Sequence, residues 1–163
     1  MSNVQQRIAG LNKQTLQPRA ETISVCRCTE DPCPLQGGRE IKDIVYEAKI
    51  NINNVQVGKY FGLTSTKFIR RFSNHMKSFK NVTYRSESTL SKNVWKQKDK
   101  GLNPDVTFSL KCKAKSYHPG DKACNLCLRE KYSIITHPPG GGLINHRDEI
   151  FSRCLHKDRW KVG

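Results

Sequence analysis

One stretch, residues 44–75, constrains the fold of this chain more than any other; its sequence is IVYEAKININNVQVGKYFGLTSTKFIRRFSNH. Apolar and polar residues alternate over 44–52 and again over 55–61, and the turn-forming pair Asn53-Asn54 lies between the two runs. This pattern predicts a β-hairpin. The apolar residues that follow recur at helical spacing, so we expect the hairpin to lead into an amphipathic helix capped by Thr64-Ser65-Thr66.

The rest of the chain is predicted to add one strand and three helices. A helix is expected after Ser88, a strand over 106–112, and helices over about 122–137 and 146–156. The order β-β-α-α-β-α-α predicts a small α+β domain, in which a three-stranded antiparallel sheet is flanked by helices. We expect four segments: an N-terminal arm (1–25), a Cys-rich zinc knuckle (26–40), the α+β domain (41–156) and a basic tail (157–163).

The net charge of the chain indicates which class of partner it binds. Lys and Arg number 29 against 14 Asp and Glu, a net charge of +15, which predicts a polyanionic partner. The sequence has neither a long apolar run nor a concentrated basic amphipathic helix, so nucleic acid is favoured over a membrane surface. The first residues lack the apolar segment of a signal peptide. The seven cysteines are therefore interpreted as thiols or metal ligands and not as a disulfide framework.

Four polar residues of the hairpin and helix form a set that a plain hydrophobic core would not need. Tyr46 and Tyr60 lie on the two strands, while Arg71 and His75 are four residues apart on the helix and share one face. With a two-residue turn, the two tyrosines would point to opposite faces of the sheet. An odd-length loop or a β-bulge, for which Gly58 is suited, is therefore expected to bring them to one face.

The ordered set Ile44-Val45-Tyr46, Tyr60-Phe61-Gly62, Arg71, Glu130 and Asn145 resembles the motifs of the GIY-YIG nucleases. Other stretches are similar to the endonuclease domain of Penelope-like retroelements, namely CRCTEDPCPL, TLSKNVW, CNLCLREK with LINHRDEI, and RCLH. The resemblance runs from about residue 26 to residue 156. It implies a metal-dependent DNA endonuclease of the nickase type that works in the nucleus. A reverse transcriptase domain would normally precede it.

The resemblance also implies a role for each residue of the set. Tyr46 would be the general base that takes the proton of the attacking water, and it would need a cationic neighbour such as Arg71. Arg71 would hold the scissile phosphate, and Tyr60 would orient the phosphate or the water. Glu130 would ligate a single hard divalent ion, Mg²⁺ or Mn²⁺. Asn145 would brace the site by hydrogen bonding to backbone or substrate.

Basic residues on the helix are candidates for contacts with DNA phosphates. The candidates are Lys67, Arg70, His75, Lys77 and Lys80. About six such contacts would give a salt dependence of binding with a logarithmic slope of about −5 for duplex DNA. No feature of the sequence indicates base reading, so a loose sequence preference is expected.

The cysteine spacing suggests zinc. The preferred ligand set follows the Penelope-like pattern of upstream cysteines and an internal histidine: Cys26, Cys28, Cys33 and His75. Two departures weaken this pattern, because Arg39 and Asn93 stand where a cysteine and a histidine are expected. A second grouping, less favoured, joins Cys124, Cys127, Cys154 and His156. Cys112 is interpreted as a small buried apolar residue.

Two other functions remain open from the sequence. One is a catalytically inactive DNA-binding zinc module, which the two departures favour and the retention of Tyr46, Arg71 and Glu130 disfavours. The other is an RNA- or chromatin-binding protein that uses its basic surface alone.

Overall fold

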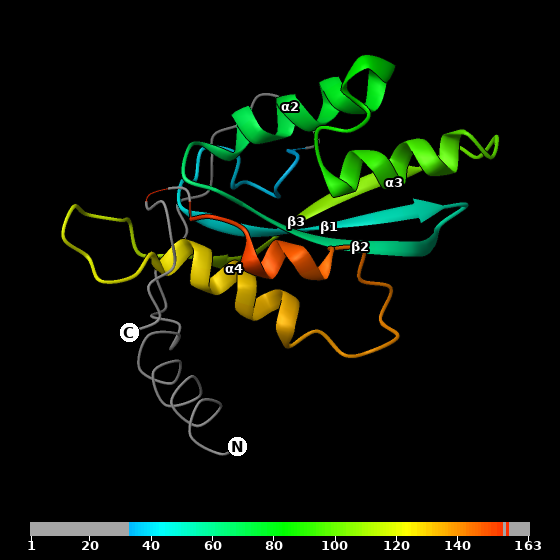
Figure 1. The fold of residues 1–163 in the computed structure, drawn as a ribbon. Helices are drawn as coiled ribbons and strands as arrows, with labels where there is room; N and C mark the ends of the chain where they lie inside the picture. The colour runs from blue at the N-terminus through cyan, green and yellow to red at the C-terminus, as the bar shows by residue number, and fades with distance from the viewer. Residues whose placement is uncertain (1–32, 155, 157–163) are drawn as a thin grey trace.

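A computed structural model describes residues 33–154 and residue 156 (Figure 1). The predicted arm 1–25, the tail 157–163 and two of the preferred zinc ligands, Cys26 and Cys28, lie outside the described residues.

Three antiparallel strands form the centre of the fold. They are β1 (Ile44–Ile52), β2 (Val55–Thr64) and β3 (Asp105–Lys113), in the order β2-β1-β3. Helices cover both faces of this sheet (Figure 1). The prediction of an α+β domain with a small three-stranded antiparallel sheet is therefore confirmed.

The hairpin between β1 and β2 turns on Asn53 and Asn54. Both have positive φ angles, 50° and 64°, as a tight two-residue hairpin turn requires. A register shift follows, because Ile50 pairs with Gly58 while the next residue of β1 pairs with Gln56. The expected bulge is thus present, beside Gly58. The bulge shifts the pairing of the rest of β2 by one residue. As a result Tyr46 pairs with Gly62, and the side chains of Tyr46 and Tyr60 lie on the same face of the sheet.

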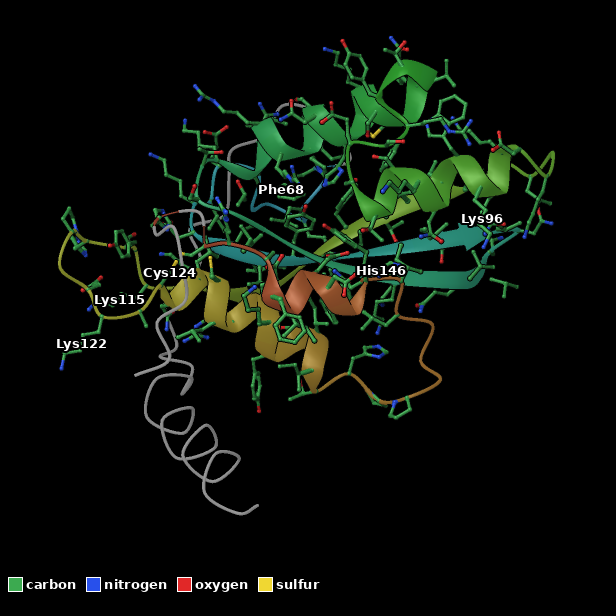
Figure 2. The ribbon with its side chains drawn as sticks, viewed as in Figure 1. Phe68, Lys96, Lys115, Lys122, Cys124 and His146 are labelled. Atoms are coloured by element: carbon green, nitrogen blue, oxygen red, sulfur yellow. The ribbon has the colours of Figure 1, made fainter. Side chains whose placement is uncertain are left out.

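Two helices pack on the face that carries the tyrosines. They are α2 (Phe68–Lys80) and α3 (Thr89–Lys98), joined by the short 3₁₀ helix η1 (Val82–Tyr84). The core on this side combines even-numbered residues of β1 with Phe68 and Phe79 of α2 and with Leu90 and Val94 of α3. Figure 2 shows the labelled Phe68 between α2 and the sheet.

The opposite face is covered by α4 (Asn125–Ile135) and by η2 (Arg147–Phe151) (Figure 1). Its core joins Val45 of β1 to Leu126 and to a group of cysteines. Among the residues that the structure describes, helices with the length and apolar character to span a membrane are absent.

Two local predictions are wrong. The cluster Thr64-Ser65-Thr66 does not cap α2, because Thr64 bonds Thr66 within the loop. The first amides of α2 bond to backbone carbonyls instead: Phe68 N–H donates to Ile41 (3.0 Å) and Ile69 N–H donates to Arg39 (2.8 Å). The helix expected over 146–156 is only the short η2.

Candidate active site

Tyr46 lies at the centre of the candidate site. It is fully buried, and a second register shift, this time between β1 and β3, falls between Val45 and Tyr46. Its hydroxyl oxygen lies 2.7 Å from Nε2 of His75 and accepts a hydrogen bond from Nε of Arg71 at 3.1 Å. Two neighbours from α2 therefore hold the phenol of β1 in place, and the tyrosine is more than a packing residue.

His75 is a partner of Tyr46 and not a surface residue. It is only 3% exposed, and its ring stacks on Phe79 and Phe108 at 5.8 Å. Burial, with a further effect from Arg71, lowers the pKa of His75 to about 3, so the imidazole is neutral at physiological pH. The prediction that His75 contacts DNA phosphates is wrong, because the ring is enclosed and uncharged.

Arg71 joins the two tyrosines. In addition to its bond to Tyr46, it hydrogen-bonds Tyr60, and the positive charge interacts with both phenols. Burial raises the pKa of Tyr46 and of Tyr60 above the ordinary value, and Arg71 only partly offsets this effect. Both phenols are therefore protonated at neutral pH. The expectation that a cationic neighbour would lower the pKa of Tyr46 is not met, although the neighbour is present.

A cleft of about 510 Å³ opens over the edge strand β2, between the start of α2 and α4. Its lining residues are Tyr60, Leu63, Thr64, Ser65, Thr66, Arg70, Arg71, Asn74, Cys127, Glu130, Ser152 and Arg153. Residues from the two faces of the sheet thus meet at this edge, with Tyr60 and Arg71 on one side and Glu130 on the other. Tyr46 lies behind Arg71.

Glu130 is the carboxylate of this cleft. Among the described residues it has no hydrogen-bond or ion-pair partner, whereas the nearby Glu149 accepts bonds from Thr89 and Asn145. Burial raises the pKa of Glu130 to about 7; the positive charge of Lys131 opposes this effect only in part, and the charge of Glu149 adds to it. A hard oxygen ligand that faces a cleft and lacks a partner fits a divalent cation.

Asn145 holds the C-terminal segment against β2. Its Oδ1 accepts from the Phe61 amide at 2.7 Å, and its Nδ2 donates to the Phe61 carbonyl at 2.8 Å. The same Nδ2 donates to Glu149 at 2.8 Å. Because the side chain must both donate and accept, an amide is required here. The site is braced through the backbone of β2, one residue from Tyr60.

Gly62 is needed because the two tyrosines approach it closely. A Cβ atom at residue 62 would lie 2.5 Å from Cζ of Tyr46 and 2.8 Å from Cε1 of Tyr60. We expect Gly62→Ala to lower the free energy of unfolding by about 2–3 kcal/mol, because both rings would have to move. Urea unfolding measures this loss.

Gly58→Ala, in the same strand, is the matched control for Gly62→Ala. Its Cβ would meet a side-chain methyl group, that of Ile144, at 3.1 Å, and the cost should stay below about 1 kcal/mol. Equal losses in the two variants would contradict the close approach at Gly62.

The other predicted DNA-contact residues, Lys67, Arg70, Lys77 and Lys80, are exposed on or beside α2. Lys67 forms an ion pair with Glu40, and the Lys77 ammonium lies 4.2 Å from the centroid of the Tyr84 ring. Arg70 lines the cleft. These positions leave the prediction of phosphate contacts open for four of the five residues.

Residues that could hold a soft metal such as zinc lie in the C-terminal part of the domain and not in the expected N-terminal knuckle. The ligand atoms of Cys124, Cys127 and Cys154 all lie within 4.8 Å of one another, and the three residues are buried. Of the preferred set, Cys33 is described in a turn region outside this group, and the Nε2 atom of His75 bonds Tyr46. The signal for the observed group was Cys124-x-x-Cys127, the tightest cysteine pair in the sequence.

Comparisons with known protein families, with curated proteins and with solved structures find no match for this chain. The class of protein must therefore be inferred from the site itself.

Proposed function

We propose that this protein is a DNA endonuclease that nicks one strand by hydrolysis of a phosphodiester bond. The observation that carries the proposal is the convergence of Tyr60, Arg71 and Glu130 on one cleft, with Tyr46 bonded directly behind Arg71. Tyr60 and Arg71 come from the consecutive elements β2 and α2, whereas Glu130 comes from α4, much further along the chain. The guanidinium and the carboxylate at the cleft supply the phosphate ligand and the cation ligand that phosphodiester hydrolysis needs, the Tyr60 phenol supplies an orienting hydroxyl, and Tyr46 behind Arg71 supplies the proton acceptor.

Arg71 binds the scissile phosphate in this mechanism, because its guanidinium lines the cleft and can donate two parallel hydrogen bonds. The hydroxyl of Tyr60 orients the phosphate and the attacking water. A divalent cation such as Mg²⁺ or Mn²⁺, held by Glu130, would supply positive charge beside the phosphate and the leaving oxygen.

Tyr46 acts as the general base and His75 accepts the proton that Tyr46 releases. As the water oxygen forms its bond to phosphorus, Tyr46 accepts the water proton and passes its own proton to Nε2 of His75. The leaving oxygen departs with the electron pair of the broken P–O bond. The relay avoids a phenolate, which the raised pKa of Tyr46 disfavours. Because the lowered pKa of His75 also disfavours the imidazolium, His75 holds the proton only until it returns through Tyr46 to the leaving oxygen.

Because the sequence resembles the endonuclease domain of Penelope-like retroelements, we propose that the nick opens nuclear DNA for the reverse transcriptase of such an element. The basic surface beside the cleft supports DNA as the substrate, because exposed Lys and Arg attract the phosphate backbone.

The pH dependence of nicking should follow Glu130. Its pKa of about 7 means that a cation must displace a proton below that pH. At limiting Mg²⁺ we expect the rate to rise about tenfold per pH unit below about pH 7 and to level off above it. Raising the Mg²⁺ concentration should move the midpoint to lower pH. Initial rates at two Mg²⁺ concentrations measure this shift, and a midpoint independent of Mg²⁺ would contradict it.

The test of the function uses supercoiled plasmid, the full chain and Mg²⁺, with EDTA and Glu130→Ala as controls. Conversion to the open circle by the unmodified protein, and by neither control, supports the endonuclease. DNA binding without a nick, measured by gel shift on the same plasmid, overturns it in favour of a binding module. Preference for a structured RNA over the plasmid, again without cleavage, overturns it in favour of an RNA-binding protein.

A further inference from the structure

The C-terminal cysteines lie beside a histidine that completes a set of four ligand atoms. Sγ of Cys127 and Sγ of Cys154 are 3.5 Å apart, and Sγ of Cys124 is 3.2 Å from Nδ1 of His156. Together with the mutual approach of the three sulfur atoms within 4.8 Å, these distances define a compact group. We propose that Cys124, Cys127, Cys154 and His156 bind one structural zinc ion.

The distances fit a tetrahedral site. Zinc bonds of about 2.3 Å to sulfur and about 2.05 Å to nitrogen place two sulfur ligands about 3.8 Å apart, and a sulfur and a nitrogen ligand about 3.6 Å apart. The group needs only small shifts to reach these values. A disulfide would require its two sulfur atoms at about 2.05 Å and would leave the third cysteine and the histidine without a role.

The surroundings favour thiolates. Cys124 is the N-cap of α4, and Cys127 lies in its first turn. The positive end of a helix dipole stabilises thiolate sulfur at such a position. The backbone amide of His156 donates to Sγ of Cys154 at 3.4 Å. Backbone N–H groups directed at sulfur stabilise the negative charge that zinc ligands carry.

The imidazole of His156 is held in position by a stacked ring. Tyr117, from the loop after β3, lies parallel to it at 14°, with the ring centroids 4.7 Å apart. Tyr117 also packs against the buried group, as do Leu63 and Cys112. In Figure 2, the labelled Cys124 lies at the start of α4, where sulfur atoms gather. The zinc ion would therefore join α4 to the C-terminal segment, and the stacked Tyr117 would hold the loop after β3 against them.

The proposed zinc site also affects the position of Glu130 in the cleft. Cys127 lines it, and Glu130 is one turn further along α4 on the same side. If the proposed function holds, the zinc ion fixes the rotation of α4 that directs Glu130 into the cleft. Zinc binding itself does not depend on that function.

Metal analysis of the full chain, purified under reducing conditions, tests the site. We expect one zinc ion per chain in the unmodified protein and in Cys112→Ser, the control, because Cys112 packs against the group without belonging to it. Cys127→Ser and Cys154→Ser should each lose the zinc. Zinc that persists in both variants but is lost in Cys33→Ser would overturn the proposal and place the metal at the N-terminal knuckle.

Cobalt substitution keeps the proposal testable if a variant fails to fold. The unmodified protein, refolded with Co²⁺, should show the intense ligand-field bands of a tetrahedral thiolate site, and these should weaken and shift in His156→Ala. Absence of the bands and of zinc in the unmodified protein would overturn the proposal. So would a Cys127–Cys154 disulfide found by mass spectrometry in the reduced preparation.

Discussion

Tyr46→Phe should lower the nicking rate by about 100-fold or more while DNA affinity stays unchanged. The substitution removes one oxygen atom, and with it the proton acceptor that links Arg71 to His75. Loss of a positioned general base costs about 10²–10⁴ in rate. Because the hydroxyl is buried behind Arg71, its loss should leave the DNA-contacting surface intact. Plasmid nicking and gel-shift assays on the same preparation measure the two effects.

Two further tyrosine variants sharpen this result. Tyr84→Phe is the matched control, because Tyr84 lies beneath Lys77, away from the cleft lining, and it should nick at the normal rate. Tyr60→Phe should lower the rate less than Tyr46→Phe, since Tyr60 is assigned an orienting role. If Tyr60→Phe abolished nicking and Tyr46→Phe did not, the base would be the phenol that lines the cleft, and the relay through His75 would be wrong.

Glu130→Gln should stabilise the protein at pH 8 in the absence of divalent cations, by on the order of 2–3 kcal/mol. The folded-state pKa of about 7 lies above the ordinary value of 4.5, so folding favours the protonated carboxyl. Between these two pH values the folded state binds more protons than the unfolded state, and stability is lost as the pH rises. Glutamine is never charged and avoids this loss, so the two proteins should be almost equally stable at pH 4.

Thermal or urea unfolding at pH 4 and pH 8 tests this difference. Mg²⁺ added at pH 8 should recover the stability of the unmodified protein and leave Glu130→Gln unchanged, because only the carboxylate binds the cation. Glu87→Gln, at an exposed position, serves as the control and should show neither effect. A pH-independent difference between Glu130→Gln and the unmodified protein would show that the carboxylate is compensated in the fold, contrary to the structure.

The local pattern of the sequence predicted the sheet well. The alternation over 44–52 matches β1, and the need to place Tyr46 and Tyr60 on one face predicted the bulge. Ser88 caps α3 as its position suggested, since its side chain accepts from the amide of Ser91. In each case the decisive information lies within a few residues of the element, or in the two-residue period of a strand.

The errors arose where distant segments decide the structure. The start of α2 is capped by carbonyls of residues 39 and 41, and a strong local cap signal was therefore misleading. His75 lies on the face of Arg71, as its spacing predicted, but its burial depends on Phe108 of β3. The preferred zinc ligands were chosen from the Penelope-like pattern of upstream cysteines and an internal histidine. The grouping of Cys124 with His156 depends instead on the path by which the C-terminal segment returns to α4, which local sequence does not indicate.

The bulge beside Gly58 limits how the length of the hairpin can change. Val57 is the residue left over between the pairs Ile50–Gly58 and Asn51–Gln56, so its deletion would remove the bulge and leave both pairs in register. Deletion of Lys59, beyond the bulge, would instead shift Tyr60 by one position and turn its side chain to the opposite side of the sheet. A single-residue deletion should therefore be tolerated at Val57 and not further along β2, because its position decides whether Tyr60 keeps its side of the sheet.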